Sequence, residues 1–340
     1  MRQYVILGCG PSARAAALEI RAQDPRARVT MISREFTPFY LRPALADYVA
    51  GALGRNELVQ QDPEILEDTE IEVRAGCRVY RLFPHESRVL LSDGTSVYFD
   101  RLLLATGAAP LLSDYAARLR NKVTTLSCLA DAVRIARAGL EQKAWVLVSG
   151  EGHTGLEAVR AFAGRGCRVV YLTTHTRFWS PHSSVARADV LQKLLTERVE
   201  VLFDEAVLDV LDLNGELYRV VTSSRRTIDV GLVCEARELV PVTDYLEGSG
   251  VLVDRGVVVD PDLRTNFDGV FAAGDVARVV DAEGNWQRTN FGWESAQAQG
   301  LVAGHNLVHG GGRSVSEGDS HFAQLHGTKL LDRWGKNRDG

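Results

Sequence analysis

The chain has 340 residues, of which 45% are apolar and 24% are charged, and its formal net charge at pH 7 is -5. This length and composition predict a folded globular protein of two or three domains and exclude a disordered chain. Because basic residues are not in excess, the charge argues against nucleic acid or an anionic membrane surface as the main partner.

The cysteines and the N-terminal segment bear on the cellular compartment. Five cysteines stand more than thirty residues apart, at Cys9, Cys77, Cys128, Cys167 and Cys234. This spacing excludes a local CxxC motif, and the odd number favours a reducing compartment. The N-terminus runs directly into the apolar segment YVILG without the ordered regions of a secretion signal, and no eighteen apolar residues run together. We therefore expect a cytoplasmic protein.

The N-terminal region predicts one βαβ unit followed by a meander of short strands. A strand, a glycine loop, a helix and a second strand are predicted over residues 4–7, 8–13, 12–22 and 29–33. Alternating runs predict short strands around residues 73–79, 88–91 and 96–99, with a hairpin turn at Asp93-Gly94. The apolar strand 102–104 then ends in ATGAAP.

The same order of elements occurs again from residue 145. A strand, a glycine loop, a helix and a strand are predicted over residues 145–148, 150–155, 156–164 and 169–172. A second meander covers residues 207–233 and turns at Asn214-Gly215. This internal repeat predicts two dinucleotide-type domains.

Each glycine loop joins a predicted strand to a predicted helix, in GCGPSA and in SGEGHTGLEA. Glycines let the backbone approach a pyrophosphate, whose charge is favoured by the unpaired N–H groups of the helix N-terminus. Plain packing of a helix on a strand also uses such turns, but the flanking strand and helix favour nucleotide binding. Two loops predict two nucleotides.

Six motifs occur in the order and spacing of a known family: GCGPSA, FYLRPALADYVAG, LLLATGAAP, GEGHTGLE, TNFDGVFAAGDVA and GWESAQAQG. Over residues 1–310 the chain resembles the flavoproteins with two dinucleotide-binding domains, the pyridine nucleotide-disulfide oxidoreductase superfamily. The YxRPxL segment and the sequence EIRAQDPRARVTMIS of the first unit most resemble the NAD(P)H:rubredoxin oxidoreductase, ferredoxin reductase and nitrite reductase flavoprotein branch.

The resemblance implies an α/β fold with two Rossmann-like domains, each of three ββα layers. An NAD(P)-binding domain over residues 115–245 would be inserted in an FAD-binding domain formed by residues 1–114 and 246–312. Residues 313–340 would form a short tail, where relatives continue into an interface domain. His321 and His326 in this segment have no cysteine or carboxylate cluster around them, so no metal site is expected.

The resemblance also implies the residues that hold FAD. Glu35 would bond the adenosine ribose, Arg42 would lie by the pyrophosphate, Pro43 under the flavin ring, Asp275 by the ribityl chain and Trp293 by the pyrimidine edge. Alternatively, Arg42 is a surface cation, Asp275 only caps a helix and Trp293 belongs to the core. The expected FAD set is Gly8, Gly10, Pro11, Ser12, Ala13, Glu35, Arg42, Pro43, Val79, Ala105, Thr106, Gly107, Asp275 and Trp293.

The second loop would hold a nicotinamide cofactor, NADH or NADPH, whose ring meets the flavin for hydride transfer. This chemistry requires alignment of two cofactors and no nucleophilic residue. Glu157 would be a helper at the nicotinamide amide, or an ordinary polar residue in the first turn of a helix. The expected set is Gly150, Gly152, His153, Thr154, Gly155, Glu157, Thr173, His175 and Arg177.

The chain departs from the family at four positions. Pro43 stands where oxidase and peroxidase relatives carry a reactive cysteine, and Asp47 stands where ferredoxin reductases often carry a lysine that pairs with the glutamate of the second loop. Thr173 replaces the acidic residue that usually selects NADH, and Glu238 replaces a glycine. The missing acid, with His175 and Arg177 nearby, favours tolerance of NADPH, although these two side chains could simply face solvent.

We therefore expect an FAD-dependent NAD(P)H oxidoreductase that passes electrons to an Fe-S or rubredoxin-type protein or to a partner subunit. A non-catalytic FAD-binding subunit with a degenerate nicotinamide site is one alternative, and Thr173 and Glu238 are the residues that bear on it. A reductase of a small oxidant is the other. The sequence does not fix the oligomeric state.

Overall fold

The computed structural model describes residues 1–37, 39–59, 70–119, 122–140, 144–174, 187–196, 199–281, 283–284 and 292–315. The chain forms two compact units. The first contains Met1–Tyr40, Gln60–Ala109 and the described part of Val240–Phe322, and the second contains Leu41–Val59 and Pro110–Leu239. The expected α/β class, with one Rossmann-like unit inserted in another, is confirmed.

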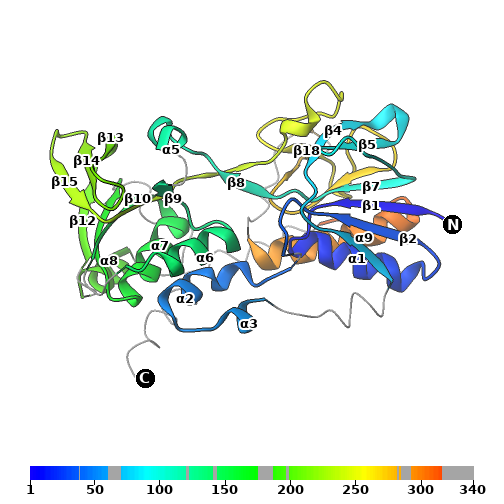
Figure 1. Cartoon of the computed structure of the whole chain (residues 1–340). Coiled ribbons are helices and arrows are strands. Elements are labelled where there is room, and N and C mark those ends of the chain that lie inside the picture. Colours follow the sequence, from blue (N-terminus) through cyan, green and yellow to red (C-terminus); the bar gives the residue numbers. More distant parts are fainter. Residues whose placement is uncertain are drawn as a thin grey trace. The chain divides into compact units, whose positions relative to one another are not determined.

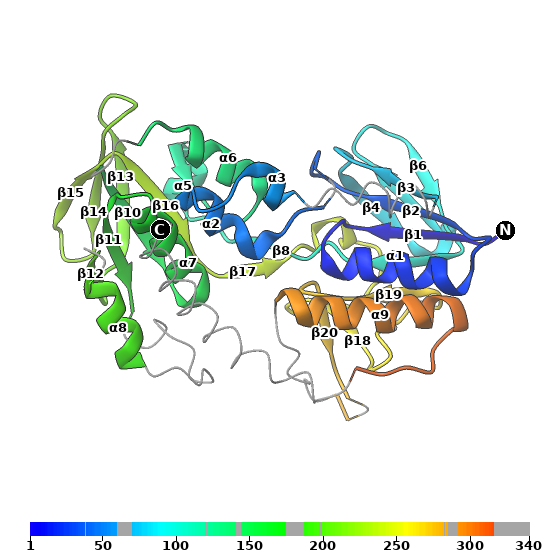
Figure 2. The same ribbon diagram turned by 90° about the horizontal axis from the view of Figure 1, so that it is seen from below.

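The first unit is built on a parallel sheet of five strands. Their order is β19 (Val270–Ala272), β7 (Arg101–Leu104), β1 (Gln3–Leu7), β2 (Arg28–Ile32) and β3 (Ile71–Arg74). The central strand β1 is buried from Tyr4 to Leu7. Both faces of a parallel sheet are covered by other elements, and this explains why the strand is an unbroken apolar run. Helices α1 (Pro11–Gln23) and α9 (Trp293–His309) lie side by side (Figures 1 and 2).

An antiparallel sheet completes the first unit. It contains β4 (Val79–Phe83), β5 (Arg88–Leu91) and β6 (Ser96–Tyr98). Leu82, Val89 and Val97 of these strands share one apolar core with β1 and α1. The close approach of α1 and α9 requires glycine, because a Cβ on Gly300 would lie 2.8 Å from the Cα atom of Ser12.

The second unit repeats this architecture. Its parallel sheet has the order β12 (Val199–Phe203), β11 (Arg168–Thr173), β10 (Trp145–Gly150), β16 (Leu232–Ala236) and β9 (Val123–Thr124). Helix α2 (Leu45–Ala50) packs on α6 (Leu129–Arg137) and α7 (Gly152–Gly164), and α8 (Arg187–Thr196) contacts β12 (Figure 1). The antiparallel sheet of β13 (Val207–Asp212), β14 (Tyr218–Thr222) and β15 (Thr227–Val230) shares a core with β10 and β11.

Shorter elements connect these layers. They are η1 (Arg42–Ala44), α3 (Arg55–Leu58), η2 (Pro84–Glu86), β8 (Ala108–Pro110), α5 (Asp114–Leu119), β17 (Leu239–Pro241), η4 (Asp244–Leu246), β18 (Val257–Val259) and β20 (Ala277–Val279). Strand β8 pairs with β17, and β18 pairs with β20. No helix among the described residues is both long and apolar enough to cross a membrane.

Two element boundaries differ from the sequence prediction. The single strand expected around residues 73–79 is wrong, because β3 ends at Arg74 and β4 begins at Val79, with a turn through Gly76 at φ +73°. Helix α7 begins at Gly152 rather than at residue 156. Residues 41–59, which the expected first domain includes, lie in the second compact unit.

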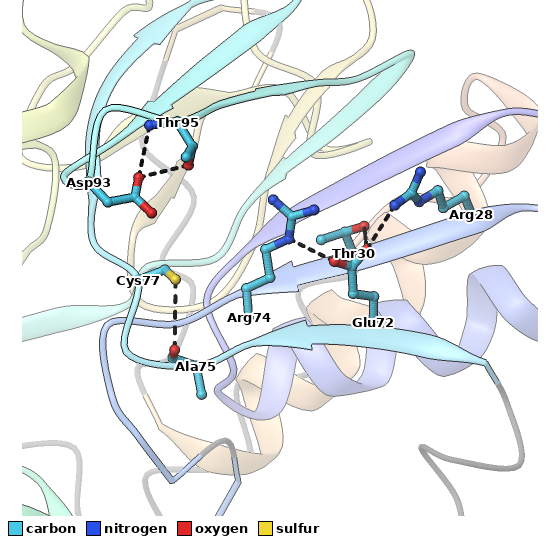
Figure 3. A network of polar contacts seen from close by, with 8 residues as sticks. All are labelled: Arg28, Thr30, Glu72, Arg74, Ala75, Cys77, Asp93 and Thr95. Atoms are coloured by element: carbon cyan, nitrogen blue, oxygen red, sulfur yellow. Dashed lines mark hydrogen bonds and ion pairs between the residues drawn. The ribbon is translucent and has the colours of Figure 1, made fainter.

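A polar network links β2 to the edge strand β3 in the first unit (Figure 3). Glu72 accepts hydrogen bonds from Arg74 Nε at 2.7 Å, Thr30 Oγ1 at 3.0 Å and Arg28 Nη2 at 3.3 Å. Burial alone would raise the pKa of Glu72, but these three donors outweigh it and lower the pKa below its ordinary value. Ionised Glu72 therefore stabilises the pairing of the two strands.

We expect Glu72→Gln to destabilise the protein by about 1 kcal/mol at pH 7, after allowance for solvent screening. The folded pKa of Glu72 lies below its unfolded value, so the stabilisation is full above the unfolded pKa and is lost as the pH falls through the folded pKa. Urea unfolding at pH 7 and at about pH 3.5 measures the difference in the free energy of unfolding between the unmodified protein and Glu72→Gln. This difference must be smaller at the acid pH. Glu86→Gln, which removes one exposed pair with Arg88, is the control; an equal, pH-independent loss in both variants would contradict the prediction.

Candidate functional site

The loop between β1 and α1 leaves backbone accessible at the helix N-terminus. Gly8 has φ +133°, and a Cβ there would overlap the carbonyl oxygen of Ala105 and lie 2.8 Å from its carbon. Gly10 is the N-cap of α1, and a Cβ on it would meet no atom within 4 Å. No side chain caps the helix and no acidic residue lies in its first turn. The loop therefore suits an anion such as a diphosphate.

The next three predicted residues build the first turn of α1. Pro11 is its first residue, where the missing N–H costs no hydrogen bond. Ser12 and Ala13 are buried, and Ser12 Oγ donates to the carbonyl of Ala273 at 3.4 Å. These residues shape the loop through packing.

Glu35 follows the end of β2, and its carboxylate is already oriented. The hydroxyl of Tyr40, a buried residue, donates to Glu35 Oε2 at 2.9 Å, and the Glu35 backbone N–H donates to Ser33 Oγ at 3.1 Å. Sequence reasoning missed Tyr40, although it stands in the quoted FYLRP motif. A fixed acceptor at this edge suits ribose hydroxyls.

The segment after β7 lies at the same edge of the sheet as Gly8. The N–H of Ala105 donates to the Leu7 carbonyl at 2.9 Å, Thr106 Oγ1 donates to the Val242 carbonyl at 2.9 Å, and Gly107 has φ +66°. Because carboxyl ends of parallel strands meet at one edge, the residues after β1, β2, β7 and β19 converge there.

Asp275, three residues after β19, accepts a hydrogen bond from the backbone N–H of Gly292 at 3.3 Å. Gly292 is the N-cap of α9. This hydrogen bond is consistent with the alternative in which Asp275 only caps a helix. Buried Gln299, which was not expected, accepts from the Gly274 N–H at 2.8 Å and fixes this loop.

Aromatic and apolar residues complete the predicted FAD set in the first unit. Trp293 opens α9 and is half-buried, with its ring centroid 5.5 Å from that of Phe39. The guanidinium of Arg14 lies 4.8 Å over the same Phe39 ring. Val79, the first residue of β4, is half-buried.

Arg42 and Pro43 form η1 of the second unit rather than part of the first. Arg42 is exposed and donates to the carbonyl of Ser127, and Pro43 is half-buried. Their predicted places at the pyrophosphate and the flavin ring remain predictions.

The loop between β10 and α7 repeats the geometry of the first loop. A Cβ on Gly150 would overlap the carbonyl oxygen of Ala236 and lie 2.7 Å from its carbon, the contact that Gly8 makes with Ala105. Gly152, at φ +55°, has no atom within 4 Å of its Cβ position, as at Gly10. Both loops thus pair one confined glycine with one open glycine, and both suit a nucleotide diphosphate.

The rest of the second loop differs from the first in two respects. Gly155 sits against β11, because a Cβ there would lie 2.5 Å from the Tyr171 hydroxyl. Glu151 is the N-cap of α7 and places a carboxylate in the loop, which disfavours an anion. His153 and Thr154 are half-buried in the first turn.

Thr173 ends β11 and is only 3% exposed, so it offers a ribose neither a carboxylate nor much surface. Glu238 is exposed, and its backbone φ is not in the left-handed region that favours glycine. Its backbone carbonyl accepts a hydrogen bond from the Leu111 N–H at 3.1 Å. This position therefore does not require a glycine. His175, Arg177, His321 and His326 lie outside the described residues. Among the described residues, no cluster of His, Cys, Asp and Glu could hold a metal ion.

Glu157 has an ion-pair partner that the sequence analysis did not identify. Position 47 provides no lysine, but Arg160, three residues along α7, donates from Nη2 to Glu157 Oε2 at 2.8 Å. The same guanidinium donates to Asp47. The i,i+3 spacing of Glu157 and Arg160 was the available signal, whereas the contact with α2 depends on tertiary packing.

Three of the five thiols have raised pKa values. All five cysteines are free, and Cys167 and Cys234 are buried. Burial raises the pKa of the Cys9 thiol to about 12 and raises the pKa values of Cys167 and Cys234. Since the thiolate is the reactive form, these three residues are poor redox nucleophiles.

Comparison with known proteins identifies the chemistry. The profile described as pyridine nucleotide-disulphide oxidoreductase matches residues 2–300. The chain belongs to this family. A pyridine nucleotide-disulphide oxidoreductase is an enzyme that uses FAD and NAD(P)H, and the two open loops fit two such nucleotides. The resemblance inferred from the six motifs is confirmed.

Two similar proteins and one solved structure are named as reductases or contain one. The chain is 26% identical to a ferredoxin-NAD(+) reductase component of 3-phenylpropionate/cinnamic acid dioxygenase from Photorhabdus laumondii, over 90% of this chain and 77% of the relative. It is 28% identical to a nitric oxide reductase FlRd-NAD(+) reductase from Klebsiella pneumoniae, over 81% of this chain and 72% of the relative. One chain in the crystal structure of the covalent putidaredoxin reductase-putidaredoxin complex has the same fold, with TM-score 0.83, 23% identity, and coverage of 93% of this chain and 77% of that chain.

Proposed function

We propose that this chain is an FAD-dependent NAD(P)H oxidoreductase that delivers electrons to a small iron-sulfur or rubredoxin-type protein, or to a partner subunit. The observation that carries the proposal is the paired loop geometry, with one confined and one open glycine at the start of α1 and again at α7. The relatives support the acceptor class, since they are named as reductases of ferredoxin and FlRd.

The residues of the two loops bind and orient, and the cofactors supply the redox chemistry. The chemistry contributed by bound FAD is hydride acceptance from NAD(P)H followed by release of single electrons. Gly8 and Gly10 would admit the FAD diphosphate to the N-terminus of α1, and Glu35, held by Tyr40, would accept from the ribose hydroxyls. Gly152 would admit the second diphosphate to α7.

Thr173 supports acceptance of both nicotinamide nucleotides. A carboxylate at the end of this strand would repel a 2'-phosphate, and buried Thr173 removes that repulsion. We therefore propose that NADPH is used as well as NADH. A hundredfold preference for NADH in kcat/KM would overturn this part of the proposal.

The raised pKa values of three thiols support transfer to an external acceptor. Burial raises the pKa of Cys9, the cysteine inside the first loop, to about 12. The CxxxxC pair of disulfide reductases is missing from the sequence. The scattered free cysteines also support a cytoplasmic location, which we propose.

Anaerobic reduction of the purified yellow protein tests the proposal. Addition of NADH or NADPH should bleach the absorbance near 450 nm within seconds, and a [2Fe-2S] ferredoxin or a rubredoxin should then support cytochrome c reduction. Bleaching by dithionite but by neither nucleotide would favour the non-catalytic subunit. Fast NAD(P)H oxidation by oxygen or a quinone, with no gain from either carrier protein, would favour the reductase of a small oxidant.

A further inference from the structure

Arg160 is a charged side chain inside the second unit. It lies on α7 and is 1% exposed, whereas an arginine is almost never fully buried unless it is paired. Its Nε and Nη2 atoms donate to Glu157 Oε2 at 3.2 and 2.8 Å, and Nη1 donates to Asp47 Oδ1. One buried cation therefore joins two carboxylates from α7 and α2.

The charges of this bridge are balanced so that Arg160 stays protonated. Burial opposes the charge, but the carboxylates of Glu157 and Asp47 outweigh it and raise the pKa of Arg160 above its ordinary value. The side chains of Glu157 and Asp47 are 24% and 18% exposed, against 2% for Arg160. The anionic ends of the bridge are thus the reachable ones, and the cation lies beneath them.

The bridge occupies a position between two functional segments of the same unit. Glu157 lies in the second turn of α7, and helical side chains lean toward the N-terminus, so it leans toward the Gly152 loop. Asp47 lies on α2, directly after η1, which carries Arg42 and Pro43.

We infer that Arg160 is a positioning residue for hydride transfer: it fixes the carboxylate of Glu157 beside the nicotinamide loop and locks α2 to α7 through Asp47. This inference rests on the proposed function. The cation of the bridge comes from Arg160 on α7, and Asp47 on α2 completes it. Two N–H donors on one carboxylate oxygen restrict the orientation of Glu157.

Arg165 shows that docking α7 against its neighbours does not need carboxylates. It follows α7 and donates to the carbonyls of Val49 at 3.2 Å and Ala136 at 2.8 Å, on α2 and α6. Buried ion pairs contribute little net stability compared with apolar packing. Apolar side chains would suffice to dock α7 on its neighbours. A role in orienting Glu157 explains why a charged arginine is buried at position 160 instead.

Anaerobic stopped-flow reduction of the FAD-loaded protein by NADH tests the inference, with melting temperature measured in parallel. We expect Arg160→Met to lower the limiting rate of flavin reduction by about ten- to hundredfold. The Kd of NADH should change less, because the glycines of the loop are untouched. The matched control, Arg165→Met, should lower the melting temperature but leave the limiting rate within about twofold of the unmodified protein.

The double variant Asp47→Lys/Arg160→Met moves the cation from α7 to α2 and should restore the limiting rate to within about threefold of the unmodified protein. Asp47→Asn keeps the shape of the side chain and should lower the rate by about threefold, so it covers the case in which Arg160→Met does not fold. Equal kinetics for Arg160→Met and Arg165→Met, no loss in Asp47→Asn, or no recovery in the folded double variant would overturn the inference alone. An unmodified protein that neither nucleotide reduces would overturn the proposed function as well.

Discussion

Gly8→Ala is expected to yield a protein that retains no FAD. The new Cβ would overlap the carbonyl oxygen of Ala105, and the backbone would keep φ +133°, which alanine rarely adopts. Steric overlap and backbone strain together cost about 3–5 kcal/mol at the loop that joins β1 to α1. FAD content after purification, read from the ratio of absorbance at 450 and 280 nm, and circular dichroism measure the effect.

Gly10→Ala is the matched control for this variant. Its Cβ would meet no atom of the protein within 4 Å, and φ at Gly10 is an ordinary -79°. The apoprotein should therefore fold as the unmodified chain does, while FAD affinity falls if the diphosphate lies against Gly10. A Gly8→Ala protein with full FAD content, or a Gly10→Ala protein with unchanged FAD affinity, would contradict this assignment of the first loop.

Gly150→Ala is expected to remain yellow but to lose reduction by NAD(P)H. A Cβ there would overlap the carbonyl oxygen of Ala236 and lie 2.9 Å from its Cβ, so β10 must shift from its partner β16. Overpacking of this kind costs about 1–3 kcal/mol and would displace the N-terminus of α7. We expect the rate of flavin reduction by NADH or NADPH to fall more than tenfold, with reduction by dithionite unchanged.

Gly231→Ala separates this effect from a general loss of stability in the second unit. Its Cβ position has only ordinary contacts, at 3.8 Å to the Trp145 carbonyl and 3.9 Å to the Glu216 carbonyl, at the opposite end of the same pair of strands. This variant should keep both its FAD and its rate of reduction. If Gly150→Ala loses FAD as readily as Gly8→Ala does, the division of the two nucleotides between the two loops is wrong.

Much of the fold could be predicted from the sequence because its strongest signals are local. Strands β1 and β10 each contain an apolar run, with a glycine at or within two residues of its end, and each leads into a helix. The hairpin at Asn214-Gly215 is equally local, since the Asn214 side chain accepts from the backbone of Glu216 and Leu217. The division of residues 73–79 into two strands was missed because the left-handed turn at Gly76 is specified by one residue inside an alternating run.

The candidate site was predicted less completely, because several of its residues act through partners from other elements. Tyr40 orients Glu35 and Gln299 holds the loop before Asp275; both residues stand in the quoted motifs, but a motif does not show which element each side chain contacts. Asp275 accepts a hydrogen bond from the Gly292 N–H at the start of α9, a contact that the motif alone does not predict.

The sequence by itself determined where the two glycine loops lie between a strand and a helix, because the chain direction at such a turn depends on the few residues of that turn. Only the tertiary structure decided that residues 41–59 pack with the second unit and that Asp47 meets Arg160. These residues stand 113 positions apart, and such a contact depends on how α2 packs on α7, which no local spacing encodes. The chain has an aspartate and not a lysine at position 47, and Glu157 pairs with Arg160 of its own helix.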